Sequence, residues 1–276
     1  MKICYKNEIK TATITATDST EFPKENLYSN QLAAHWSPGA KTGVIDFYNA
    51  SGINIDYALL NGHNLTEGAT ITITADNTDI ESPAYTGTLE LCKNPLPLTD
   101  DEGNIITDEH GDPIIIMQWY KDVSLVNKVF VGGTNAKYNY VRISISDPGN
   151  ANNIEVGYIF LGEALTLPNI KSGDKIRAYK TNSDSQKNET GQLYGYKKTR
   201  LKRAEFALEG LTEEQRNDFD LFAATCDITE PFHLIFWEND LHIEEPLFCA
   251  MTEFPQPQEV PEGFLYNVTM SIEECK

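Results

Sequence analysis

The side chains best suited to catalysis are scattered along the chain. No histidine has a serine, cysteine or carboxylate at the spacing of a catalytic triad or of a zinc-protease motif. His233 and His242 stand nine residues apart near Glu238 and Asp240, which leaves a metal pair as an alternative to ordinary strand and loop residues. The remaining histidines are His35, His63 and His110. We therefore expect no catalytic residues, no metal site and no cofactor, and we predict that the protein is not an enzyme.

An acidic near-repeat at residues 98–116 is the second place where chemistry could be sought. Asp100, Glu102, Asp108 and Asp112 supply the hard oxygen ligands that calcium prefers. The spacing of an EF-hand loop is absent, so we favour an exposed hairpin excursion over a calcium loop. The five cysteines are scattered without a C-x-x-C pair, which predicts reduced thiols rather than a disulfide framework or a zinc site.

Net charge and the distribution of apolar residues disfavour further classes of function. The net charge of −19 disfavours stable binding to nucleic acid. No apolar stretch approaches the length of a membrane span, so we expect no membrane insertion. The N-terminus also lacks the apolar core of a signal peptide, which favours synthesis in a cytoplasm.

A basic strip interrupts this acidic chain. Residues 205–276 carry 17 acidic residues against two basic ones, a net charge of −15, directly after the strip. The two surfaces could meet between identical subunits, although an ordinary solvated strand is the simpler interpretation. The candidate interface residues are Lys197, Lys198, Arg200, Lys202 and Arg203.

The hydrophobic pattern predicts a mainly β protein of two domains. Residues 11–17, 69–75 and 140–146 alternate between apolar and polar positions, as half-buried strands do, and residues 154–162 are apolar almost throughout. Short strands separated by Asn, Gly, Asp and Pro turns favour an antiparallel jelly-roll β-sandwich over residues 1–167.

The pattern changes in the C-terminal part, which we assign to an α+β domain of residues 168–276. A polar segment follows Lys171 and is either a linker or a hairpin arm. One helix is expected at about 212–225, because Thr212 and Gln215 have the spacing of a capping box. The strands expected around this helix cover residues 197–211, 231–238, 246–254 and 263–273.

The segment "YALLNGHNL", residues 57–65, ends in a sharp polar corner. Asn-Gly positions accept a positive φ, and a short polar side chain can cap a strand end. We interpret His63 and Asn64 as a corner that fixes the sandwich, with sugar contact or catalysis as alternatives. Sugar sites need stacking rings with polar partners, for which the candidates are Trp36, Trp119 and Tyr120.

Three segments, residues 35–65, 68–77 and 140–165, together resemble the galactose-binding-like (discoidin-like) jelly roll found in bacteriophage tail proteins. The resemblance covers roughly residues 25–165. Its motifs are a Trp-containing segment, a G-H-N-L corner, a Y-V-R-I strand and a final G-x-x-x-L-G strand. The matching residues are Trp36, Gly62 to Leu65, Tyr140 to Ile143, Gly157, Leu161 and Gly162.

The order of elements after residue 168 resembles the tail-tube-like fold of siphophage tail tubes and distal tail proteins. The two resemblances imply a virion structural protein of the tail, assembled in the host cytoplasm. It would form or join a homo-oligomeric ring at the distal tail or baseplate and contact the tube, hub and tip proteins. The alternative is a carbohydrate-binding or host-adhesion module that binds a host surface glycan, and exposed aromatic residues would discriminate between the two.

Overall fold

The computed structural model describes residues 1–17, 19, 21–66, 68–89, 107, 128–131, 136–168, 176–181, 184–187, 193–196, 200–236, 246–260 and 265–275. The acidic near-repeat, apart from Thr107, lies outside these residues, as does His242. The chain divides into two compact units. Lys6–Ala164 makes up most of the sandwich unit, and the C-terminal unit contains Met1–Tyr5, Leu165–Phe236 and Leu247–Lys276.

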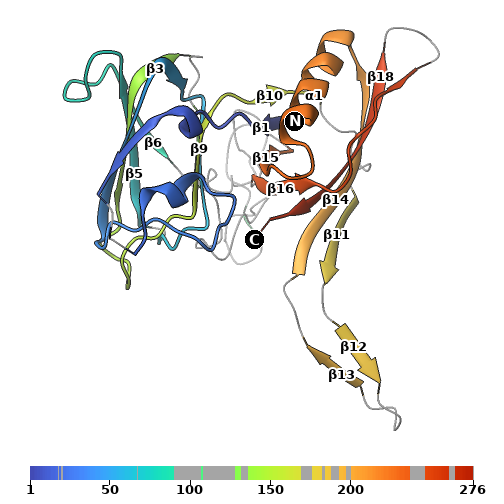
Figure 1. The fold of residues 1–276 in the computed structure, drawn as a ribbon, viewed down its shortest axis with the longest axis horizontal. Helices are drawn as coiled ribbons and strands as arrows, with labels where there is room; N and C mark the ends of the chain where they lie inside the picture. Colours follow the sequence, from blue (N-terminus) through green and yellow to red (C-terminus); the bar gives the residue numbers. More distant parts are fainter. Residues whose placement is uncertain are drawn as a thin grey trace. The chain divides into compact units, whose positions relative to one another are not determined.

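The sandwich unit consists of two antiparallel sheets (Figure 1). A five-stranded sheet has the order β2-β3-β8-β5-β6, and a three-stranded sheet has the order β7-β4-β9. The strands of the first sheet are β2 (Thr13–Ala16), β3 (Thr42–Asn54), β5 (Thr70–Asp76), β6 (Tyr85–Leu89) and β8 (Lys137–Ser146). Those of the second are β4 (Tyr57–Asn61), β7 (Lys128–Val131) and β9 (Tyr158–Gly162). The described part of the unit also contains two short 3₁₀ helices, η1 (Glu8–Thr11) and η2 (Lys24–Tyr28).

The core of the sandwich follows from the alternation of the long strands. Ile45 and Phe47 on β3 and Val141 and Ile143 on β8 are buried in one cluster, while the residues between them face outward. Removing large aliphatic side chains from water stabilises the fold by roughly 1.5–3 kcal/mol for each one fully buried. The same alternation leaves the other face of the five-stranded sheet free to meet solvent or a ligand.

The C-terminal unit is built on an eight-stranded sheet. Its main path has the order β10-β1-β15-β16-β18-β14-β11, with β17 paired to β18. The strands are β1 (Lys2–Cys4), β10 (Leu165–Thr166), β11 (Ile176–Thr181), β14 (Arg200–Leu211), β15 (Phe232–Ile235), β16 (Leu247–Met251), β17 (Gln258–Glu259) and β18 (Tyr266–Glu274). The sequence placed Met1–Tyr5 with the sandwich, whereas β1 pairs with β10 and β15 of this sheet.

Helix α1 (Glu213–Cys226) packs its apolar face into the core of the C-terminal unit. Phe219, Phe222 and Ala223 are buried there, and Phe222 meets Phe232 of β15 edge to face at 4.9 Å. The predicted capping box is confirmed: the Thr212 hydroxyl accepts from the Gln215 N–H, and the Gln215 side chain accepts from the Thr212 N–H. The cap satisfies two N–H groups that would otherwise be unpaired at the helix start.

A nested hairpin leads out of the same sheet. β11 pairs with the first half of β14, and beyond them β12 (Asp184–Lys187) pairs with β13 (Leu193–Tyr196), as Figure 1 shows. The polar segment after Lys171 is therefore a hairpin arm in its described part rather than an unstructured linker. The prediction of a mainly β chain with one helix near residues 212–225 is confirmed for the described residues.

Candidate functional site

The outward face of the five-stranded sheet carries a line of side chains that belongs to no core. On β3 this line contains Val44, Asp46 and Tyr48, and on β8 it contains Arg142 and Ser144. The strands pair with Tyr48 opposite Tyr140, Asp46 opposite Arg142 and Val44 opposite Ser144. Because directly opposed residues on one face lie about 5 Å apart, each pair forms a continuous patch across two strands.

Two tyrosines form an aromatic platform at one end of this line. The rings of Tyr48 and Tyr140 lie 4.8 Å apart between centroids and are tilted by 40°. Tyr48 keeps 40% of its surface exposed, so part of the ring remains available to a ligand. Tyrosine offers an apolar ring together with a polar hydroxyl, which suits a surface that must contact a partly polar ligand.

A planar ion pair stands beside the platform. Arg142 donates from Nε to Asp46 Oδ1 at 2.6 Å and from Nη2 to Asp46 Oδ2 at 3.0 Å. The hydrogen bonds from the guanidinium to the Asp46 carboxylate raise the pKa of Arg142 above its ordinary value. Both side chains remain about one third exposed, at 31% and 39%. These two parallel hydrogen bonds form a bidentate pair, the Asp46–Arg142 fork, which holds both groups in fixed orientations at the surface.

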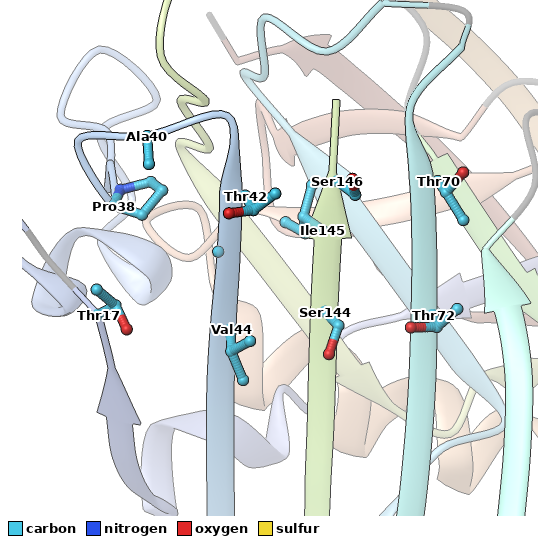
Figure 2. Close-up of a pocket in the computed structure, with 11 residues that line it drawn as sticks. Thr17, Pro38, Ala40, Thr42, Val44, Thr70, Thr72, Ser144, Ile145 and Ser146 are labelled. Carbon is cyan, nitrogen blue, oxygen red and sulfur yellow. The ribbon is translucent and has the colours of Figure 1, made fainter. Parts of the chain in front are cut away.

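A groove of about 480 Å³ continues the line toward the start of β3 (Figure 2). Its floor spans three strands, where Thr42 and Val44 of β3, Ser144 and Ser146 of β8, and Thr70 and Thr72 of β5 stand in adjacent rows. Thr17, Pro38 and Ala40 flank the β3 side, as Figure 2 shows. The volume lies within the range of small-molecule sites in proteins.

This face offers hydrogen-bonding and apolar groups to a ligand. Each hydroxyl of the groove can both donate and accept hydrogen bonds, and the two tyrosines supply apolar contact. Within the described part of the chain, no three or more histidine, cysteine, aspartate or glutamate side chains stand together where they could hold a metal ion. Threonine is also common on solvent-facing strands, so the hydroxyls alone would not select a ligand. Their combination with the platform, the fork and the groove identifies the site.

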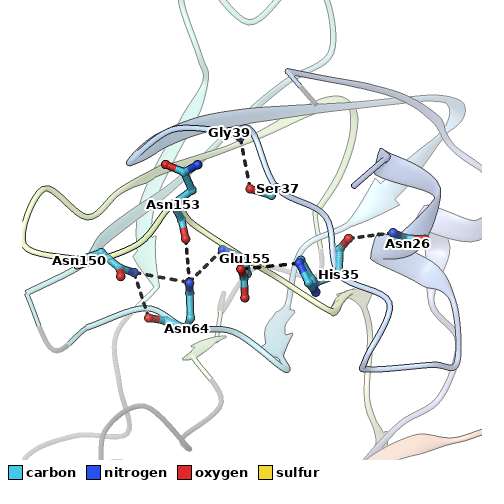
Figure 3. Close-up of polar contacts among 8 residues, drawn as sticks. All are labelled: Asn26, His35, Ser37, Gly39, Asn64, Asn150, Asn153 and Glu155. Carbon is cyan, nitrogen blue, oxygen red and sulfur yellow. Dashed lines mark hydrogen bonds and ion pairs between the residues drawn. The ribbon is translucent and has the colours of Figure 1, made fainter. Parts of the chain in front are cut away.

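The fold itself uses the hydrogen-bonding groups of the predicted corner residues, and Figure 3 shows those of Asn64. The Asn64 side chain donates to the Asn153 carbonyl at 2.7 Å and accepts from the Glu155 N–H at 2.9 Å. Asn150 donates to the Asn64 carbonyl at 3.0 Å. Nδ1 of His63, a buried residue, accepts from the Leu65 N–H at 3.3 Å. These hydrogen bonds link the segment that follows β4, at Asn64, to residues 150–155, which precede β9.

The aromatic candidates named from the sequence do not meet at one place. Trp36 is fully buried in the sandwich core, so its ring cannot stack on a surface ligand. This removes Trp36 from the candidate contacts, because a ring at the centre of a core serves packing. The Trp36 backbone N–H donates to the Val156 carbonyl, and the Trp36 carbonyl accepts from the Val156 N–H. Trp119 and Tyr120 lie outside the described residues.

The basic strip is described only in its second half. Lys197 and Lys198 lie outside the described residues, and β14 begins at Arg200. Arg203 is exposed and stands opposite Glu273 of β18, an acidic residue of the same sheet. The Lys202 N–H donates to the Glu274 carboxylate at 3.0 Å. The strip therefore already has acidic neighbours within its own unit.

Sequence reasoning missed Tyr48, Tyr140 and Asp46 as site residues. From the sequence, Tyr140 belongs to the Y-V-R-I motif, and the predicted strands do not include residues 42–48. The signal was present, since Val44, Asp46 and Tyr48 alternate with the apolar Ile45 and Phe47. The pairing of β3 with β8, which brings the two tyrosines together, could not be obtained from local alternation.

The sequence matches no known family model and no curated protein. A carbohydrate-binding module, CBM32-6, produced by Clostridium perfringens shares 12% identity with a TM-score of 0.33, over 55% of this chain and 93% of that one. The chitosan-binding module 1 of a chitosanase/glucanase from Paenibacillus sp. IK-5 shares 16% with a TM-score of 0.34, over 57% and 98%.

A truncated AlyQ with CBM32 and alginate lyase domains shares 13% identity with a TM-score of 0.32, over 78% of this chain and 49% of that chain. None of the helices in the described ranges has the length and apolarity required to cross a membrane.

Proposed function

We propose that this protein binds carbohydrate through the outward face of the five-stranded sheet. The observation that carries the proposal is the exposed Tyr48 ring, packed on Tyr140 and placed beside the Asp46–Arg142 fork. A sugar presents an apolar ring face and a rim of hydroxyls. The tyrosines match the ring face, and the fork with its neighbouring hydroxyl side chains matches the rim.

Other ligand classes fit this face less well. A nucleic acid needs uncompensated positive charge, whereas Arg142 is engaged by Asp46 and the chain carries a net charge of −19. The core of a protein interface needs a cluster of apolar anchors. Beside the hydroxyls, the groove offers only Val44, Pro38, Ala40 and Ile145 as apolar residues. A polyhydroxylated ligand uses the hydroxyls directly.

Affinity electrophoresis in gels that contain soluble polysaccharides, followed by calorimetry, tests this function. We expect the full chain to be retarded and the Tyr48→Ala variant to lose roughly 30-fold in affinity, as when an interface anchor worth about 2 kcal/mol is truncated. Phe254→Ala, which removes an exposed aromatic ring from the C-terminal unit, is the matched control and should bind normally. Equal binding by the wild type and Tyr48→Ala would remove the site from this face.

We also propose, as a second function, that the C-terminal unit assembles with copies of itself as a structural ring of a phage tail, which would place the protein in the virion. The nested hairpin favours it, because β12 and β13 pair only with each other within the described residues. Such a ladder leaves backbone donors and acceptors for a neighbouring strand edge. The tube, hub and tip proteins would be its further partners.

Sedimentation of a charge-reversed variant tests self-assembly. Reversing Lys197, Arg200 and Arg203 to Glu should weaken assembly and leave the monomer folded. Each exposed ion pair contributes no more than about 1 kcal/mol, so the loss should be partial and smaller in moderate salt. Unchanged sedimentation at low and moderate salt, or a wild-type chain that remains monomeric, would count against this second function.

A further inference from the structure

We infer that the ligand is an extended, uncharged polysaccharide chain lying along β3 and β8, rather than a single terminal sugar. This inference rests on the proposed function and specifies the ligand of the same face. It is drawn from the length of the line of side chains, the order of groups along it and the absence of charge in the groove.

The line is long compared with one sugar ring. Tyr48 and Thr42 are six residues apart on β3, which corresponds to roughly 20 Å along an extended strand. Their partners on β8, Tyr140 and Ser146, span the same distance in the opposite chain direction. Every second residue between these ends points outward, so the contact groups recur about every 7 Å along both strands.

The order of groups along this line defines two binding regions. The tyrosine platform occupies one end, the Asp46–Arg142 fork follows, and the groove begins at the next row with Val44, Ser144 and Thr72. A single sugar on the platform would contact the tyrosines and the fork but leave the groove unused. A chain that starts on the platform and follows the strands reaches both regions.

The groove recognises hydroxyls without using charge. None of the 11 residues that line it is charged, and the fork between groove and platform is internally paired. A polyanionic chain would meet no unpaired cation along this line and would approach a protein of net charge −19. The side chains of the groove therefore fit a neutral chain whose hydroxyls can exchange donor and acceptor roles with threonine and serine.

A length series of neutral oligosaccharides tests the inference by calorimetry on the full chain. The probes are cello-, manno- and N-acetylchito-oligosaccharides, each from a single sugar to a hexamer, with alginate oligomers as the charged comparison. We expect affinity to rise at least tenfold from the single sugar to the hexamer in one neutral series, and alginate oligomers to bind more weakly than that series.

Variants at the two ends separate the regions. Tyr48→Ala should weaken binding at every length, whereas the double variant Thr72→Val with Ser144→Ala should weaken only the longer oligomers. Thr269→Val, an exposed change on β18 of the C-terminal unit, is the control and should change neither. Unfolding curves that match the wild type would show that the groove variant remains folded, since both of its changes lie on the outward face.

The outcomes distinguish this inference from the proposed function. Equal affinity for the single sugar and the hexamer, with weaker binding by Tyr48→Ala, would overturn the inference of an extended chain. It would leave the proposal of carbohydrate binding in place. Preference for alginate would overturn the neutral ligand. No binding by any probe would overturn both.

Discussion

The two sheets of the sandwich use their faces differently. In the three-stranded sheet every residue of β4 and β9 is buried. In the five-stranded sheet β3 and β8 bury alternate residues and present the others outward. β4 and β9 thus contribute side chains to the interior only, while β3 and β8 contribute to the core and also carry the face that we propose for ligand binding. The comparison predicts that outward residues of β3 and β8 can be substituted with little effect on the core.

The largest expected difference lies between matched aliphatic truncations in the two sheets. Leu60→Ala on β4 removes a fully buried side chain of the sandwich core and should lower the free energy of unfolding by about 2–5 kcal/mol. Val44→Ala on β3 changes a side chain that is 38% exposed, and it should cost less than about 1 kcal/mol. Urea denaturation measures both, and similar losses would break the distinction between a closed and an open sheet.

An intermediate loss of stability is expected at Asp147, which follows the end of β8 and joins the five-stranded sheet to the segment that contains Thr66. Asp147 is fully buried and accepts from the Thr66 N–H at 2.8 Å, the Thr66 hydroxyl at 2.6 Å and Asn150 Nδ2 at 3.1 Å. Asp147→Ala leaves these donors without a partner and should cost about 1–3 kcal/mol in urea denaturation. Asp147→Asn, which keeps an acceptor oxygen, should cost less. A neutral result for the alanine variant would mean that water replaces the carboxylate.

The smallest effect should appear only in acid, at the turn between β5 and β6. Hydrogen bonds from the Thr78 backbone and hydroxyl, and from the Ala84 and Asp79 N–H groups, lower the pKa of Asp76 from 3.8 to about 2. Because the folded-state pKa is depressed, this stabilisation is complete above about pH 4 and is lost as the pH falls through about 2. The stability of Asp76→Asn should therefore fall less steeply over this range. Urea denaturation at several pH values measures this, and an equal decrease of unfolding free energy in the wild type and Asp76→Asn from pH 4 to pH 2 would refute the prediction.

Much of the fold could be predicted from local patterns. The strict alternation of residues 69–75 and 140–146 indicated half-buried strands, and these lie in β5, which begins one residue later at Thr70, and in β8. Thr212 and Gln215 located the start of α1 to the residue, because a capping box is a local hydrogen-bonding arrangement. The site was harder to predict. Trp36 seemed suited to stacking by its type, but its position in the core excludes that role.

What the sequence by itself determined is which residues of each strand share a face, since side chains alternate along any extended chain. It placed Arg142, Ser144 and Ser146 opposite the core before any partner strand was known. Only the tertiary structure decided which strands are neighbours. Asp46 and Arg142 are 96 positions apart in the chain, and Tyr48 meets Tyr140 because β3 pairs with β8 in one particular register. The same holds for β1, whose three residues pair with strands at residues 165–166 and 232–235. The physical reason is that register depends on backbone hydrogen bonds and core packing between distant segments, which no local periodicity encodes.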